Sequence, residues 1–278
     1  LPIAGCSQLE AFNALTPKDA GGRLAEKDVA YGWHARQKLD LYVPLTAPET
    51  PAPLLVFFYG GSWNSGDKAP YSWVGRALAA QGFPVAVPDY RLVPEHRFPA
   101  FLEDGAAAVA KARELAPRHG GDPDRIVPIG HSAGAWLAIM LALDAARLEA
   151  AGVPERAVAA GVGLAGPYDF LPLDKPSTIE AFGRWPRPQE TQPIAFARAD
   201  APPLLLATGT EDETVLPRHT NALADRLTSL GAVAERKLYP GVDHIEIVLG
   251  LSRPFRGKPP VLADTVDFVR RRAVKRTG

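Results

Sequence analysis

Short apolar runs alternate with helical segments along most of this chain, and this pattern restricts the fold more than any other feature. The runs are rich in aliphatic and β-branched residues and lie at 54–58, 84–88, 126–129, 158–164 and 204–208. Amphipathic or alanine-rich stretches typical of helices lie at about 72–81, 100–116, 133–149, 217–230 and 261–274. Such alternation predicts a parallel sheet that is covered by helices on both faces.

The domain organisation follows from the segments around this repeat. Residues 28–33 and 39–43 predict an antiparallel strand pair that opens the sheet. With 278 residues and 46% hydrophobic side chains, the chain is long and apolar enough for one large α/β domain. We expect an N-terminal arm over 1–27 and the domain over 28–278. Residues 170–203 hold seven prolines with Phe182, Trp185 and Phe196 between them, which predicts an irregular cap inserted into the domain.

The charge balance and the N-terminus bear on partners and location. Lys plus Arg and Asp plus Glu both total 31, which argues against nucleic acid and favours a small or neutral substrate. Ile3-Ala4-Gly5-Cys6 resembles a bacterial lipobox, which predicts a lipid anchor on Cys6 and a place in the bacterial cell envelope or periplasm. The alternative is an ordinary partly buried cysteine in the arm of a cytoplasmic protein. The oligomeric state is left open.

One pentapeptide carries the strongest chemical signal. Gly130-His131-Ser132-Ala133-Gly134 fits the pattern G-x-S-x-G and lies directly after an apolar run and directly before a predicted helix. A serine in such a sharp turn projects its hydroxyl into the open, and the flanking glycines are required because a side chain there would collide with the neighbouring strand or helix. The pattern predicts Ser132 as a nucleophile, with the Ala133 N–H at the helix N-terminus as a donor to an oxyanion.

A serine nucleophile needs a base and an acid that orients the base. His244 is predicted as the base because it follows Ser132 in the chain and lies in a turn just after the strand 235–238. Asp212 is predicted as the acid because it follows the apolar run 204–208, with Glu211 and Glu213 as rivals and Asp243 as a weaker one. Strand ends at that edge of an α/β sheet are where catalytic loops gather.

The run 54–58 leads into Tyr59-Gly60-Gly61-Ser62-Trp63, whose glycines would let a loop at the end of this strand come close to a substrate oxygen. We assign the backbone donors to Gly61 and Ser62, together with Ala133. Tyr59 and Trp63 flank the loop and are predicted to line the substrate pocket, as are Tyr168 and Trp185 in or beside the expected cap. A G-x-G-x-x-G match at 161–166 is rejected as a cofactor site because Pro167 follows it instead of a helix. The chemistry requires no metal and no cofactor.

Together these segments resemble the hormone-sensitive-lipase-like and feruloyl-esterase-like carboxylesterases of the α/β-hydrolase superfamily. The run 89–99 (DYRLVPEHRFP) and the segment 121–126 (GDPDRI) are similar to the sequences those families carry before the nucleophile. Tyr59 replaces the usual histidine of the oxyanion motif, and Ser62-Trp63 resembles the His-Gly-Gly-x-Trp group. The resemblance implies an α/β-hydrolase fold with a mostly parallel eight-stranded sheet.

The resemblance also implies a reaction class. It points to a serine carboxylesterase that hydrolyses short-chain or aromatic acyl esters through an acyl-enzyme, with a small-molecule ester as its partner. Two alternatives stay open at this point. One is an arylformamidase or other amidase of the same fold, and the other is a catalytically inactive binding module.

Overall fold

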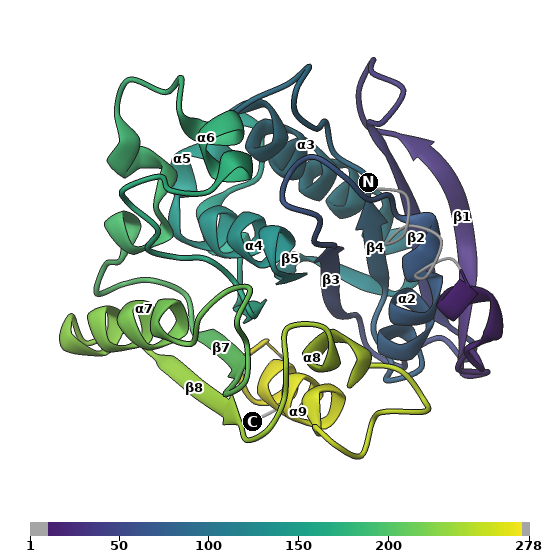
Figure 1. The fold of residues 1–278 in the computed structure, drawn as a ribbon. Helices are drawn as coiled ribbons and strands as arrows, with labels where there is room; N and C mark the ends of the chain where they lie inside the picture. The colour runs from purple at the N-terminus through teal and green to yellow at the C-terminus, as the bar shows by residue number, and fades with distance from the viewer. Residues whose placement is uncertain (1–10, 274–278) are drawn as a thin grey trace.

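A computed structural model describes residues 11–273 and contains one eight-stranded sheet with strand order β1-β2-β4-β3-β5-β6-β7-β8 (Figure 1). The first two pairings, β1 with β2 and β2 with β4, are antiparallel, and all others are parallel. The mostly parallel sheet predicted from the apolar runs is therefore confirmed. The strands are β1 Gly22–Ala30, β2 Lys38–Pro44, β3 Ala52–Phe58, β4 Val85–Pro88, β5 Gly121–His131, β6 Gly161–Leu164, β7 Leu204–Gly209 and β8 Ala234–Tyr239.

The first strand differs from the prediction. β1 covers Gly22–Ala30 and not 28–33, so the sheet begins inside the segment 1–27 that was expected to be an arm. The boundary at residue 28 is therefore too late. β1 is an edge strand with irregular register and mostly exposed or half-buried side chains, so it lacks the apolar pattern of the inner strands. Residues 31–37 instead form the turn to β2, closed by Tyr31 N–H donating to the Gln37 carbonyl at 2.9 Å.

Helices cover both faces of the sheet, with α2 and α9 on one face and α3, α4 and α7 on the other (Figure 1). The strand order explains why α2 and α3 lie on opposite faces. The chain moves in one direction across the sheet from β3 to β4 and in the other direction from β4 to β5. Because both crossovers are right-handed, their helices lie on opposite faces. The helices are α2 Ser72–Ala79, α3 Ala100–Leu115, α4 Ala133–Leu143, α5 Ala145–Ala150, α6 Pro176–Phe182, α7 Arg218–Ser229, α8 Glu246–Leu249 and α9 Val261–Ala273.

The single helix predicted over 133–149 is two helices. α4 ends at Leu143, and Asp144 adopts a non-helical conformation with φ −92° and ψ 80° before α5 begins. The two differ in environment, because every residue of α4 is buried whereas Leu148 is the only buried residue of α5. Alanine-rich sequence runs through both helices, so helix propensity alone gave no sign of the break.

Residues 170–203 contain the helix α6 and two 3-10 turns, Pro188–Thr191 and Pro193–Phe196. Phe182 of α6 lies in an aromatic cluster with Trp63 and Trp136, at ring-centroid distances of 4.8 and 5.2 Å. The Trp136 indole N–H also donates to the Thr191 carbonyl at 2.9 Å. The segment is therefore packed onto α4 through buried side chains, and aromatic pairs of this kind add to the stabilisation from burial.

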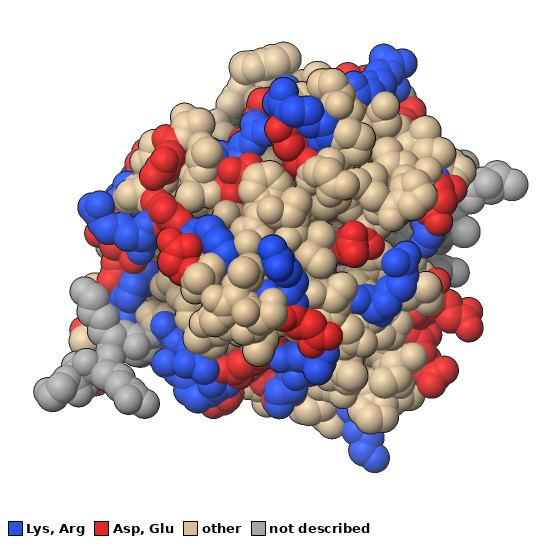
Figure 2. Space-filling model, turned by 90° about the vertical axis from the view of Figure 1, so that its left-hand side faces the viewer, with Lys and Arg blue, Asp and Glu red and all other residues tan. Residues whose placement is uncertain are grey.

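One face of the molecule agrees with the balanced composition. On the side that carries α6 and α7, Lys and Arg side chains lie beside Asp and Glu side chains (Figure 2). Within residues 11–273, no helix combines the length and the apolar character needed to cross a membrane. Cys6, the predicted lipidation site, lies outside the described residues.

Candidate active site

The strand-to-helix turn between β5 and α4 presents Ser132. Its backbone has φ 57° and ψ −123°, and its N–H donates to the Leu164 carbonyl of β6 at 2.9 Å. A Cβ on Gly130 would overlap the Gly134 carbonyl, and one on Gly134 would overlap the Phe58 carbonyl of β3. The glycines are required for the reason predicted from the sequence, since the helix and the adjacent strand leave no room for side chains. The strained conformation of a non-glycine residue is typical of functional sites.

The structure brings together three residues that are far apart in the chain. The Ser132 hydroxyl lies 2.9 Å from Nε2 of His244, and Nδ1 of His244 lies 2.8 Å from Oδ2 of Asp212. A carboxylate only accepts, so Nδ1 carries the ring proton and Nε2 is left to accept from the Ser132 hydroxyl. Asp212 and His244 are 1% and 8% exposed. This is the arrangement in which a serine can transfer its proton to a neutral imidazole.

The rival carboxylates have other surroundings. Glu211 and Glu213 are exposed on either side of Asp212. Asp243 is also exposed, and its Oδ1 accepts from the N–H groups of Ile245 and Glu246, both at 2.8 Å. Among the four acidic candidates in residues 11–273, Asp212 is the one hydrogen-bonded to His244.

His131 makes a contact with the His244 loop that was not predicted from the sequence. Its Nε2 lies 2.8 Å from the His244 carbonyl, and the two rings lie 4.8 Å apart. Burial lowers the pKa of His131 to about 3, so the ring is neutral at pH 7 and Nε2 donates to the carbonyl. His131 therefore ties the end of β5 to the loop that carries His244. The sequence signal that could have indicated this contact is that His131 directly precedes Ser132.

The loop after β3 lies against the serine. A Cβ on Gly60 would lie 2.9 Å from Cβ of Ser132, and Gly61 has φ +130°, which favours glycine. Ser62 and Trp63 also have positive φ, at 50° and 60°. The Gly61 carbonyl accepts from the Asn64 and Ser65 N–H groups, which closes the turn. Within residues 11–273 no protein acceptor is found for the N–H groups predicted as oxyanion donors, those of Gly61, Ser62 and Ala133.

A cavity of about 370 Å³ opens beside Ser132. Ser62, Trp63 and Ala133 line it, so one of the four aromatic residues predicted to bind substrate is present. Most of the other lining residues were not predicted, and they come from 167–178 and from the segment that follows Asp212: Pro167, Phe170, Leu171, Pro172, Asp174, Lys175, Ser177, Thr178, Thr214, Val215, Leu216, Arg218 and His219. The sequence signal that could have identified them is their place in the chain. Residues 167–178 follow β6, which bonds to Ser132, and residues 214–219 follow Asp212.

Three residues predicted as substrate contacts, Tyr59, Tyr168 and Trp185, do not line this cavity. Tyr59 is fully buried, and its hydroxyl is held by Arg36 and Asp89 and does not reach the cavity. Tyr168 is fully buried against Gly163 and Gly166. Trp185 packs edge-on against Phe98 at 4.9 Å, and its indole N–H donates to Glu190 at 3.0 Å. In each case the ring belongs to the packing of the protein.

His219, at the start of α7, is the histidine among the residues that line the cavity. Burial is the main cause that lowers its pKa, to about 4, and the positive charge of Arg218 adds to the effect. His219 is therefore neutral at pH 7. No group of three or more His, Cys, Asp or Glu side chains in residues 11–273 is arranged to hold a metal ion.

Comparison with known proteins assigns the chain to a family. The sequence model of the BD-FAE family matches residues 39–227, which run from within β2 to within α7 and include Ser132 and Asp212. The chain belongs to the BD-FAE family. The predicted resemblance to α/β-hydrolase esterases is thereby confirmed.

Curated relatives of this BD-FAE family member carry esterase names. Esterase LipC of Mycobacterium tuberculosis is 31% identical over 236 residues, which are 78% of this chain and 58% of the relative. A probable isoprenylcysteine alpha-carbonyl methylesterase of Oryza sativa subsp. japonica is 29% identical over 265 residues, 87% of this chain and 63% of the relative. The chain thus spans about three fifths of the length of these proteins.

Solved structures confirm the fold of the BD-FAE chain. Esterase B from Lactobacillus rhamnosis superposes with a TM-score of 0.81 at 21% identity, covering 96% of this chain and 90% of that chain. A truncated carbohydrate esterase from gut microbiota superposes with a TM-score of 0.79 at 21% identity, covering 94% and 100%. The α/β-hydrolase architecture is therefore shared with known esterases.

Proposed function

We propose that the protein is a serine carboxylesterase that hydrolyses short-chain or aromatic acyl esters through an acyl-enzyme on Ser132. The observation that carries the proposal is the hydrogen-bonded series Ser132–His244–Asp212, with Ser132 open to the cavity. The esterase names of relatives support the same reaction class. No observation favours an amidase or an inactive binding module.

In the proposed reaction the Ser132 oxygen attacks the ester carbonyl while Nε2 of His244 takes the hydroxyl proton. The carbonyl oxygen becomes negative and is stabilised by the N–H groups of Gly61, Ser62 and Ala133. Collapse of this intermediate breaks the bond to the alcohol, which leaves with the proton from His244. Water then attacks the acyl-enzyme with His244 again as base, which releases the acid and restores the serine.

The cavity supports the proposed substrate class. A volume of about 370 Å³ lies at the small end of ligand pockets. Trp63 and Phe170 give its wall an apolar, aromatic part. A short acyl chain or an aromatic ring would be buried there, whereas a long chain would extend beyond the cavity into solvent.

The test is a panel of p-nitrophenyl esters from acetate to laurate together with a feruloyl ester. We expect kcat/KM to be highest for short and aromatic acyl groups. Ser132→Ala should lose activity by roughly 10⁵-fold or more and lose labelling by a fluorophosphonate probe, as expected for a triad nucleophile. N-formylkynurenine should be a poorer substrate than the esters. Activity retained in Ser132→Ala, or faster cleavage of N-formylkynurenine than of every ester, would refute the proposal.

The predicted lipid anchor on Cys6 and the location in the cell envelope stay predictions. The support for both is the lipobox-like Ile3-Ala4-Gly5-Cys6. Expression of the full gene product in a bacterium with a radiolabelled fatty acid should label the protein and not its Cys6→Ser variant. An unlabelled wild-type protein would contradict the prediction.

A further inference from the structure

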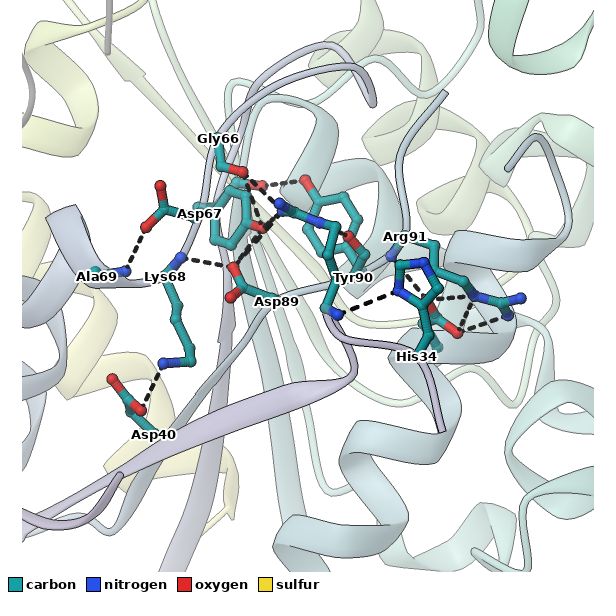
Figure 3. A network of polar contacts seen from close by, with 12 residues as sticks. His34, Asp40, Gly66, Asp67, Lys68, Ala69, Asp89, Tyr90 and Arg91 are labelled. Carbon is teal, nitrogen blue, oxygen red and sulfur yellow. Dashed lines mark hydrogen bonds and ion pairs between the residues drawn. The ribbon is translucent and has the colours of Figure 1, made fainter. Parts of the chain in front are cut away.

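The segment 59–68 carries the proposed oxyanion donors Gly61 and Ser62 between β3 and the next 3-10 turn. Gly61 and Ser65 bond to each other inside this segment, so the turn is internally closed. Its placement over Ser132 depends on what holds its two ends. A polar network that lies beneath the loop provides those contacts (Figure 3).

Arg36, from the turn between β1 and β2, bonds to both ends of the segment. Its Nη2 donates to the Tyr59 hydroxyl at 2.8 Å and to the Gly66 carbonyl at 2.7 Å. Its Nε donates to the Tyr90 carbonyl after β4 at 2.8 Å. One planar guanidinium thus fixes the first residue of the segment, the residue after its turn and the neighbouring strand end, which a single-point cation could not do.

Asp89 also bonds to both ends. Its Oδ1 accepts from the Tyr59 hydroxyl at 2.8 Å and from the Lys68 N–H at 2.7 Å, and Figure 3 shows Asp89 lying beside the backbone of Lys68. Burial raises the pKa of Tyr59 well above its ordinary value, so its hydroxyl keeps its proton and donates to Asp89 while accepting from Arg36. Tyr59 is therefore the hydrogen-bonded link between the cation and the carboxylate.

The ring of Tyr59 is held as firmly as its hydroxyl. It stacks between Tyr71 and Tyr90, at centroid distances of 5.4 and 4.9 Å and interplanar angles of 16° and 21°. The Tyr90 hydroxyl donates to the Tyr59 carbonyl at 2.8 Å. A Cβ on Gly66 would lie 2.9 Å from the Tyr59 ring, so the far end of the segment also rests on this residue.

We propose that Arg36, Tyr59 and Asp89 are positioning residues that form a clamp on the segment 59–68 and hold the N–H groups of Gly61 and Ser62 where the oxyanion develops. The inference rests on the proposed serine esterase function. It gives Tyr59 a role other than the substrate contact expected from its place in the chain. The clamp should stabilise the transition state more than the bound ester, because preorganised N–H donors contribute most when the negative charge forms on the oxygen.

The first test is Tyr59→Phe, which keeps the stacked ring and removes only the hydroxyl. Loss of one oxyanion donor typically lowers kcat by about 10²-fold to 10³-fold, and loosening two donors should lower it by roughly tenfold. We expect KM for p-nitrophenyl acetate to stay within about twofold, because ground-state binding does not use these donors. Affinity for a trifluoromethyl ketone, whose adduct with Ser132 places an oxyanion in the same position, should fall in parallel with kcat.

Tyr239→Phe is the matched control. Tyr239 is also buried, at 6% exposure, and its hydroxyl donates to the carboxylate of Asp264 at 2.8 Å. Both variants lose a buried tyrosine hydroxyl and should melt at a lower temperature than the wild type. We expect Tyr239→Phe to keep wild-type kcat and trifluoromethyl ketone affinity at 25 °C. An equal loss in both variants would show general loosening and overturn the clamp.

The second test is Arg36→Lys, which keeps the charge but cannot bond to Tyr59, Gly66 and Tyr90 together. We expect a loss of kcat similar to that of Tyr59→Phe, and the double variant should lose little more than either single one because both break one network. If the losses of kcat in the two single variants add fully in the double variant, or if Tyr59→Phe keeps wild-type kcat, the inference is overturned but the proposed function is not. A folded wild-type protein that hydrolyses no ester would overturn the proposed function and the inference with it.

Discussion

The carboxylate of Asp212 divides its two oxygens between His244 and the backbone. Oδ2 lies 2.8 Å from Nδ1 of His244, whereas Oδ1 accepts from the N–H groups of Thr214 and Val215 at 3.0 and 2.8 Å. The backbone donors fix the rotation of the carboxyl group, so that Oδ2 faces the imidazole. The turn after β7 thereby sets both the position of His244 and its tautomer.

Asp212→Asn should keep this geometry and lose the reaction. The amide oxygen of asparagine can still accept from Thr214 and Val215, which leaves the NH₂ group facing Nδ1 of His244. A donor there favours the ring tautomer with its proton on Nε2, which cannot accept from Ser132. We expect kcat to fall by about 10⁴-fold, the loss typical of this substitution in a Ser-His-Asp triad.

The measurement is kcat for p-nitrophenyl acetate, with circular dichroism to confirm the fold. Glu213→Gln is the control, since Glu213 is an exposed carboxylate next to Asp212 in sequence and should be dispensable. A large loss in Glu213→Gln with an active Asp212→Asn would reverse the assignment of the acid.

The arrangements that could be predicted from sequence are those whose cause is local or topological. The turn at Ser132 could be predicted because a strand, two glycines and a helix must be consecutive to form it. The approach of Asp212 and His244 to Ser132 could be predicted because the carboxyl ends of parallel strands meet at one edge of the sheet. These rules relate chain order to space without any knowledge of side-chain packing.

The features that were missed depend on contacts between distant segments. Tyr59 was predicted to contact the substrate because it precedes the oxyanion glycines. Its hydroxyl instead accepts a hydrogen bond from Arg36, 23 residues earlier in the chain. Edge strand β1 has no buried face to mark it in the pattern. The cavity wall comes from α6, α7 and the segments beside them, and no periodicity shows which of their side chains point inward.

Gly134→Ala should be strongly destabilising. The added methyl group would overlap the backbone carbonyls of Phe58, the last residue of β3, and of Tyr59, which follows it, and the sheet holds Phe58 in place. Overpacking in a well-packed core typically costs about 1–3 kcal/mol, and backbone atoms on the other side of the contact place this variant at the upper end.

Urea unfolding measures the difference, with Gly257→Ala as the control. A Cβ on Gly257 has no heavy atom within 4 Å, so this second variant should be within about 0.5 kcal/mol of the wild type. Equal stability of the two variants would contradict the close approach of α4 to β3.

Glu235 should stabilise the protein at neutral pH through two arginines of α9. Its carboxylate bonds to Arg271 and Arg272, and the bond to Arg271 is the main cause that lowers its pKa to about 2. A lowered carboxyl pKa contributes stability above the unfolded value near 4.3, and this contribution is lost as the pH falls toward 2. Because the arginines are about 40% exposed, we expect Glu235→Gln to cost only about 1 kcal/mol at pH 7.

Urea titrations at pH 7 and pH 3 test this ion pair. The difference between wild type and Glu235→Gln should shrink at pH 3, where the unfolded wild-type residue is protonated. Asp267→Asn is the control, because Asp267 bonds to Arg271 from a more exposed position and should contribute about 0.3 kcal/mol. A difference that stays constant with pH would show that the charge of Glu235 is not the cause.

The two buried histidines beside the active site should make the fold lose stability as the pH drops below neutrality. The pKa values of His131 and His219 are lowered to about 3 and about 4, whereas the unfolded chain has its histidine pKa near 6.5. Below pH 6.5 the unfolded state therefore binds protons that the folded state does not, so the free energy of unfolding decreases as pH falls. The two residues together should remove about 2 kcal/mol between pH 6 and pH 5, where most carboxylates stay ionised.

Urea unfolding across this range measures how the free energy of unfolding changes with pH. The variant His219→Gln should lose the contribution of one histidine, about 1 kcal/mol over this pH unit. A wild-type slope near zero, or no change in His219→Gln, would mean that these imidazoles are protonated inside the fold.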